Sequence, residues 1–106
     1  MSDPITDLAA MITRVKKLRA ALPPVSDPKD DWSSWRASHT KHREAVAKTM
    51  NELRRMHGAR IHVTPSHSRM ALLGVRASST AGGGAMLDNW LANAREHMQK
   101  MAEAGA

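Results

Sequence analysis

The side chains of this 106-residue chain that could do chemistry are six histidines and sixteen lysines and arginines. His39 and His42 lie three positions apart, so both could face one metal ion from the same side of a helix. A structural zinc site needs about four ligands, and the chain has no cysteine and no HExxH spacing. We therefore predict no metal site, and we interpret the two histidines as part of an apolar helix face.

The sequence contains no recognisable catalytic set. It lacks a cysteine nucleophile, a Gly-x-Ser-x-Gly elbow and a Walker lysine. Of its ten carboxylates, three cluster at Asp27, Asp30 and Asp31, where a helix start explains them because the helix dipole favours negative charge there. We predict a non-enzymatic protein without a cofactor.

The net charge of +6 is concentrated in the middle of the chain. Residues 36–76 carry nine basic side chains against two acidic ones, which favours a phosphate-bearing partner such as nucleic acid. The alternative is a solvated surface that only keeps a small protein in solution. The residues predicted to bind nucleic acid or a partner are Arg36, Lys41, Arg43, Lys48, Arg54, Arg55, Arg60, Arg69 and Arg76. Among them, Lys41, Lys48 and Arg55 recur every seven residues and form the best candidate line of phosphate contacts.

A second candidate for anion binding is the small and hydroxyl-rich segment that follows Arg76. Its glycines and backbone N–H groups, placed before a helix, could hold an anion. The alternative is a flexible linker with a hydroxyl N-cap. The residues of this possible anion loop are Ser78, Ser79, Thr80, Gly82 and Gly83.

The aromatic side chains are three tryptophans, since phenylalanine and tyrosine are absent. Trp32 and Trp35 lie three apart near a predicted helix start, where they could stack on bases or contact a partner protein. Because Trp90 is the one other ring that can fill a core, we favour a core position for the pair.

The pattern of apolar residues predicts the elements that must position these groups. Helical spacing indicates helices over about 4–21, 28–57 and 85–103, with Asp-Pro start signals for the first two. Residues 60–64 and 69–77 read as two strands that form a hairpin. The prediction is an α+β fold, mostly helical, in the order α-α-β-β-α, with a long second helix and one β-hairpin.

We expect a single small domain over residues 1–106. It consists of a helical half, 4–57, followed by the hairpin and the C-terminal helix, 59–103. The short linker between the first two helices predicts that they pack as an antiparallel pair. A lone hairpin is marginal, so it must lie on the helices or pair with another copy, which makes a homo-oligomer possible.

One stretch of the chain resembles small uncharacterised accessory proteins of tailed phages and prophages. It comprises Leu72 to Thr80, Met86 to Trp90 and Ala94-Arg95: a hydrophobic strand, a hydroxyl-rich segment, and a helix with Asn-Trp and Ala-Arg. The resemblance covers residues 72–95 only. It implies a mobile-element accessory protein that acts in the cytoplasm of a bacterial host.

Three functions remain open at this point. The leading hypothesis is a binding protein for nucleic acid or a nucleoprotein complex, acting through the basic middle of the chain. The alternative is a protein–protein inhibitor of a host defence effector, similar in role to an anti-CRISPR protein, or of another host enzyme. A second alternative is a phage structural or connector subunit that uses its hairpin for strand addition. No membrane partner is expected, because the longest apolar run is far shorter than the roughly 20 residues of a membrane span.

Overall fold

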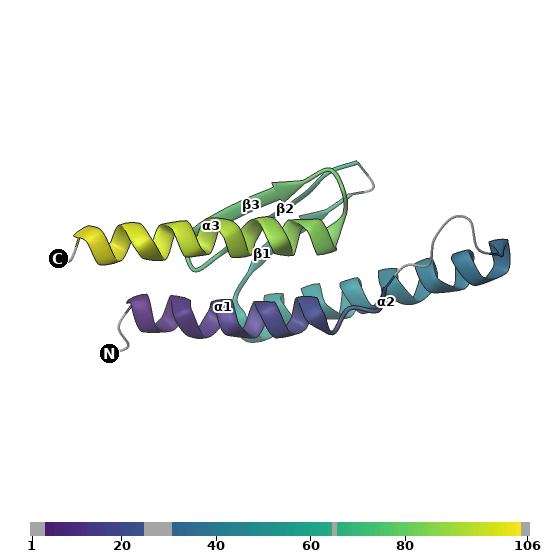
Figure 1. Ribbon diagram of the computed structural model, residues 1–106, viewed down its shortest axis with the longest axis horizontal. Helices are drawn as coiled ribbons and strands as arrows, with labels where there is room; N and C mark the ends of the chain where they lie inside the picture. The colour runs from purple at the N-terminus through teal and green to yellow at the C-terminus, as the bar shows by residue number, and fades with distance from the viewer. Residues whose placement is uncertain (1–3, 25–30, 65, 105–106) are drawn as a thin grey trace.

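The computed structural model describes residues 4–24, 31–64 and 66–104. Its elements follow in the order α1 (Pro4–Ala20), α2 (Trp32–His57), β1 (Arg60–Val63), β2 (Ser68–Leu72), β3 (Val75–Ser79) and α3 (Gly83–Ala104) (Figure 1). The predicted α+β class with mostly helical content is confirmed, and so is the long second helix. The Asp27-Pro28 start signal and the start at residue 28 lie outside the described residues, and α2 begins at Trp32.

The end of α2 is set by a glycine in the left-handed conformation. Gly58 has φ 70° and ψ 20°, which glycine adopts without the Cβ clash of other residues. The next N–H, of Ala59, donates to the carbonyl oxygen of Leu53 at 3.1 Å. This cap turns the chain directly into β1.

The sheet has one more strand than predicted. The run 69–77, expected to be one strand, is divided by a two-residue turn at Leu73 and Gly74, which have φ values of 51° and 75°. Two central residues with positive φ are typical of the tight type I′ hairpin turn, whose twist matches that of the strands. The result is a three-stranded antiparallel sheet in the order β1-β2-β3, and the predicted order of elements gains a strand.

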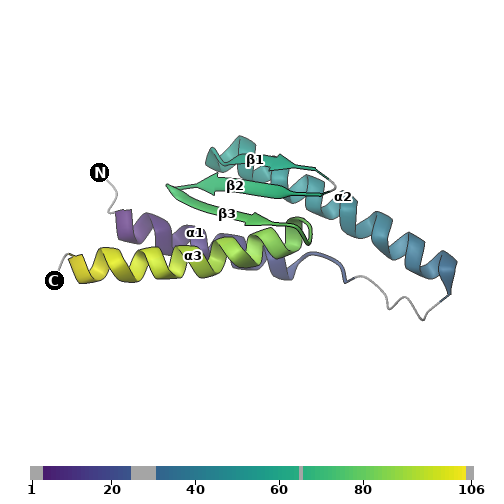
Figure 2. The same cartoon turned by 90° about the horizontal axis from the view of Figure 1, so that it is seen from above.

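All three helices lie behind one face of the sheet. α3 packs along β3 and β2, and α1 packs along α3 (Figures 1 and 2). Trp90 is fully buried between α3 and the sheet, and its indole N–H donates to the carbonyl oxygen of Leu72 at 3.3 Å. The core is formed by Leu8, Ile12, Val15, Leu22, Met50, Leu53, Ala59, Met70, Leu72, Val75, Ala77, Met86, Leu87, Trp90, Leu91 and Ala94.

The first two helices run antiparallel, as Figures 1 and 2 show. Arg14 of α1 forms an ion pair with Glu52 of α2 at 3.0 Å. α2 also approaches α3 closely: a Cβ built on Gly83 would lie 2.5 Å from Cγ1 of Val46. The glycine at the start of α3 therefore makes room for α2.

The N-terminal part of α2 extends beyond the ends of α1 and α3 (Figure 1). The molecule is accordingly elongated, with extents of 55 × 25 × 23 Å. None of the helices in the described residues combines the length and the apolar character that a membrane crossing requires.

Candidate functional site

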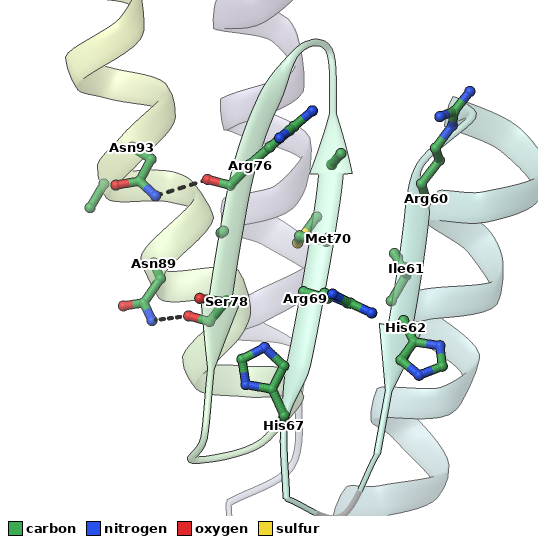
Figure 3. Close-up of a pocket in the computed structure, with 13 residues that line it drawn as sticks. Arg60, Ile61, His62, His67, Arg69, Met70, Arg76, Ser78, Asn89 and Asn93 are labelled. Carbon is green, nitrogen blue, oxygen red and sulfur yellow. Dashed lines mark hydrogen bonds between the residues drawn. The ribbon is translucent and has the colours of Figure 1, made fainter.

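The outer face of the sheet, opposite the helices, carries a basic hollow of about 780 Å³ (Figure 3). Strand geometry explains which side chains reach it, because successive residues point to opposite faces. In β2, Met70 and Leu72 are buried whereas Arg69 is exposed; in β3, Ala77 is buried whereas Arg76 is exposed. We call this surface the outer face and define it by Arg60, His62, Arg69, Ala71, Arg76 and Ser78, with His67 at its end.

Strand register arranges the outer face in two rows. Arg60, Ala71 and Arg76 lie opposite one another across β1, β2 and β3. The second row is His62, Arg69 and Ser78. Since neighbouring strands are about 4.8 Å apart, the Cα atoms of Arg60 and Arg76 are separated by about 10 Å. Ala71 between them is small, so the first row leaves open space at its centre.

The charged side chains that line the hollow are all basic. Three arginines and two histidines line it, and none of the described residues that line it is acidic. Within the described ranges, the guanidinium groups of Arg60, Arg69 and Arg76 take part in no ion pair and no side-chain hydrogen bond. By contrast, the basic side chains with structural partners lie elsewhere: Arg14 pairs with Glu52, and Arg19 with Asp88, both at 3.0 Å.

Side chains from two helices occupy the edges of the sheet. On the β3 side, Asn89 and Asn93 are one helical turn apart on α3, and their amide groups donate to the carbonyl oxygens of Ser78 and Arg76 at 2.7 and 2.9 Å (Figure 3). On the β1 side, Arg54 of α2 donates to the carbonyl oxygen of Ile61 at 3.0 Å. The sheet is thus held at both edges while its outer face stays bare.

This arrangement suits the binding of anions. A guanidinium offers planar, paired N–H donors that match a phosphate or a base edge, and it is always charged. Histidine, serine and asparagine side chains around the arginines add further hydrogen-bonding groups. The chemistry available on the outer face is therefore recognition of a polyanion by several parallel arginines.

The predicted basic residues are divided among three places. Arg60, Arg69 and Arg76 gather on the outer face. Arg54 binds the edge of β1 and also donates to Asn51 at 3.2 Å. The remaining five lie on α2 and are exposed: Arg36, Lys41, Arg43, Lys48 and Arg55.

Helix geometry separates these five into two groups. At 100° per residue, Lys41, Lys48 and Arg55 lie about 120–160° around the axis from the buried Leu53, so the predicted line exists and points away from the core. Arg36 and Arg43 share instead the flank of Arg54, which reaches β1. The line of three is not part of the hollow.

The predicted anion loop is not a single loop. Ser78 and Ser79 belong to β3, and Ser78 alone among the five predicted residues lines the hollow. The hydroxyl of Ser79 accepts the N–H of Ala81 at 2.9 Å, and Gly82 has φ 96°. Gly83 is buried against Val46. The glycines therefore serve the tight turn and helix packing.

The predicted core position of the first tryptophan pair is wrong for Trp32, which is 66% exposed. Its ring stacks on Trp35 with centroids 5.0 Å apart, and Trp35 contacts the ring of His39 at 4.1 Å. We call these three residues the aromatic cluster of α2. The cluster lies on the N-terminal part of α2, which extends beyond α1 and α3 (Figure 1). It continues the apolar stripe of α2, and the spacing of its residues therefore resembles that of a core helix.

His42 is bound to another part of the chain, since its Nδ1–H donates to the carbonyl oxygen of Pro23 at 2.8 Å. Over the ranges 4–24, 31–64 and 66–104, no three potential metal ligands of the His, Cys, Asp or Glu type come together.

Four polar residues at the hollow are absent from the sequence prediction: His62, His67, Asn89 and Asn93. The alternation of Arg60 and His62 with apolar neighbours was a signal for the first of them, since it places both on one face of a strand. The spacing of four between the two asparagines marks one side of a helix. Neither pattern shows which strand that side will meet.

Comparison with known proteins gives no further assignment: no protein-family model, no curated protein and no solved structure matches the chain.

Proposed function

We propose that this protein binds nucleic acid through the outer face of its sheet. The observation that carries the proposal is the gathering of Arg60, Arg69 and Arg76 in one open hollow without an acidic neighbour. Three like charges on a single small sheet repel one another, so the isolated fold gains nothing from placing them together. A phosphate backbone would relieve that repulsion, and phosphate contacts by arginine dominate nucleic-acid affinity.

This proposal shifts the site from the position that the sequence favoured. Lys41, Lys48 and Arg55 are exposed along one helix, and none of them lines the hollow on the outer face. The outer face instead combines a hollow with arginine, histidine, serine and asparagine side chains that surround it. The resemblance to phage accessory proteins remains compatible with such a role and adds no residue to it.

The experiment compares two triple variants that remove equal charge. One is Arg60→Gln, Arg69→Gln, Arg76→Gln; the other is Lys41→Gln, Lys48→Gln, Arg55→Gln. Affinity for mixed-sequence nucleic acid is measured from about 50 to 200 mM salt. Each lost contact with duplex phosphates should lower the salt slope by about 0.9. We expect a drop of about 1.8 for two phosphate contacts, or about 2.7 where all three arginines meet phosphates, in the sheet variant. The helix variant should show a much smaller drop, and both variants should keep their thermal midpoints.

Two results would contradict the proposal. Equal weakening by both triple variants would mean that only net charge matters. Absence of binding by the wild type at about 50 mM salt, where electrostatic association is strong, would remove the nucleic-acid function altogether.

A second candidate function is supported by the aromatic cluster of α2. Trp32 is exposed and stacks on the half-buried Trp35, and tryptophan is enriched among the residues that dominate affinity in protein–protein contacts. This favours the inhibitor hypothesis as the runner-up, with a host protein or enzyme as its target. Tight binding to one purified protein complex, lost on Trp32→Ala but kept in the Arg60, Arg69, Arg76 variant, would support it over nucleic-acid binding.

The connector hypothesis has less support. It requires a free sheet edge for strand addition between copies. Arg54, Asn89 and Asn93 already bind main-chain carbonyls at the two edges. A stable ring in solution would nevertheless restore it.

A further inference from the structure

We propose that the ligand of the outer face is double-stranded DNA and that the sheet docks in the major groove. In this arrangement Arg69, on the central strand, reads a guanine edge, whereas Arg60 and Arg76, on the outer strands, contact the phosphates on either side. The inference rests on the proposed function and adds the type of nucleic acid, the groove and the role of each arginine.

The first argument is that no phenylalanine, tyrosine or tryptophan ring lies on the outer face, where the aromatic rings of the described residues are the small imidazoles of His62 and His67. Proteins that bind single strands rely on aromatic side chains on which successive bases stack. This chain has neither phenylalanine nor tyrosine. Of its tryptophans, Trp90 is buried in the core and the other two lie on α2. The outer face therefore presents hydrogen-bond donors and charge, which suit a paired duplex better than unstacked bases.

The second argument is size. Three strands at about 4.8 Å spacing present a face about 10 Å across between the outer Cα positions. The major groove of B-DNA is about 12 Å wide and admits up to two strands of a ribbon, so the central strand enters it while the outer strands lie at its rims. The minor groove, about 6 Å wide, is too narrow for this arrangement. The major groove of duplex RNA is deep and narrow, and side chains cannot read it. B-form DNA is therefore the duplex that fits.

The third argument is the placement of the arginines. Arg69 belongs to the middle strand and to the row between His62 and Ser78, so it lies at the centre of the face. A guanidinium at that position can donate both of its parallel N–H groups to O6 and N7 of guanine, the commonest specific contact in the major groove. Arg60 and Arg76 are about 10 Å apart, which is close to the separation of the two backbones that border the groove.

The sheet can approach DNA in this way because nothing in the described structure covers its outer face. The helices lie behind the sheet (Figure 3). The edge contacts from Arg54, Asn89 and Asn93 end on main-chain carbonyls, and they fix the strands from which the arginines project. A rigid scaffold of this kind limits the ordering entropy that binding must overcome.

The test measures the affinity of the full chain for four forms of one G·C-rich sequence of about 20 base pairs. They are duplex DNA, single-stranded DNA, duplex RNA, and duplex DNA in which 7-deazaguanine replaces guanine. The last keeps charge and base pairing and lacks the N7 acceptor. We expect the unmodified duplex DNA to bind tightest. Loss of a bidentate contact corresponds to about 5- to 160-fold in affinity, and we expect the 7-deazaguanine duplex to bind at least about 5-fold more weakly.

The variant Arg69→Met isolates the reading residue, because methionine has a similar length and cannot donate a hydrogen bond to guanine, whereas lysine still could. We expect it to bind the normal and 7-deazaguanine duplexes equally. Its salt slope should stay near that of the wild type, because a base contact neutralises no phosphate. Arg55→Met on α2 is the matched control, and it should discriminate as the wild type does.

The outcomes separate the two proposals. Equal affinity for all four nucleic acids, still weakened by the Arg60, Arg69, Arg76 triple change, would overturn major-groove docking and leave nucleic-acid binding intact. Continued discrimination by Arg69→Met would overturn the role of Arg69. Failure of the wild type to bind any of the four would overturn the proposed function itself.

Discussion

The amide of Asn93 holds the main chain of Arg76, while the guanidinium of the same arginine pairs with no other residue that the structure describes. The Asn93 Nδ2 donates to the Arg76 carbonyl oxygen at 2.9 Å, and Asn89 does the same for Ser78. α3 thus fixes the backbone of β3 without using the groups that point into the hollow. In Arg76 and Ser78, the main-chain carbonyls therefore stabilise the fold, whereas the side chains are left to bind the ligand.

Removal of these amides should loosen β3. Asn89→Ala and Asn93→Ala should each lower the free energy of unfolding by about 1 kcal/mol, the net value of a typical hydrogen bond. Asn93→Asp should cost at least as much, because a carboxylate oxygen cannot donate to the Arg76 carbonyl. Chemical denaturation checks this, with the exposed Gln99→Ala as control. Unchanged midpoints for both alanine variants would contradict the structural role of the pair.

Gly83 should not tolerate a side chain. A Cβ there would lie 2.5 Å from Cγ1 of Val46, so Gly83→Ala should destabilise the fold by about 1–3 kcal/mol through overpacking. The neighbouring Gly84→Ala meets only the flexible end of Arg19, at 3.3 Å, and should be nearly neutral.

A double variant tests the Gly83 contact directly. Addition of Val46→Ala to Gly83→Ala should recover part of the loss, which a double-mutant cycle detects as a coupling energy. Strict additivity of the two changes would show that the helices do not meet at this point.

The core contribution of the first two helices can be measured at Leu8 and Leu53, which are 2% and 0% exposed. Leu8→Ala and Leu53→Ala should each lower the free energy of unfolding by about 2–5 kcal/mol, because each leaves a cavity. Met56→Ala, at a position 70% exposed, should change it by no more than about 0.5 kcal/mol. Similar denaturation midpoints for all three variants would disprove the assigned helix faces.

Replacement of the buried Trp90 should lower the free energy of unfolding far more than replacement of the exposed Trp32. Trp90→Ala should cost about 3–5 kcal/mol, since it empties the largest core position and removes the indole hydrogen bond to the Leu72 carbonyl. Trp32→Ala should change the free energy of unfolding by no more than about 0.5 kcal/mol. Thermal denaturation of the two variants measures the difference. A large loss for Trp32→Ala would mean that the aromatic cluster belongs to the core.

Helix prediction succeeded because proline, glycine and apolar spacing act locally. Gly58 and the Pro23-Pro24 pair ended helices where their backbone preferences require it. The second hairpin was missed because Leu73, a residue that rarely adopts positive φ, occupies a turn position with φ 51°. Gly74 is the sole turn signal within the apolar run 69–77, so the composition of the run predicts one strand. In the folded protein, tertiary packing divides the run into β2 and β3.

The residues of the site were easier to find than their arrangement. Charge alone indicated Arg60, Arg69 and Arg76, but it also indicated six further basic residues of α2, among which sequence periodicity favoured Lys41, Lys48 and Arg55. The register that brings the three arginines around Ala71 depends on the extra turn at Leu73 and Gly74. A one-residue slip in register would turn every side chain of a strand to the other face, so the hollow could not be derived before the strands were placed.

The hydrogen bonds at the edges of the sheet also affect the tendency of the protein to aggregate at high concentration. A bare sheet with free edges templates intermolecular pairing and aggregates. Here Arg54 binds the Ile61 carbonyl at one edge, Asn89 and Asn93 bind the Ser78 and Arg76 carbonyls at the other, and the exposed face is charged. The fold can therefore present an uncovered sheet at high concentration while it resists the growth of β-rich aggregates.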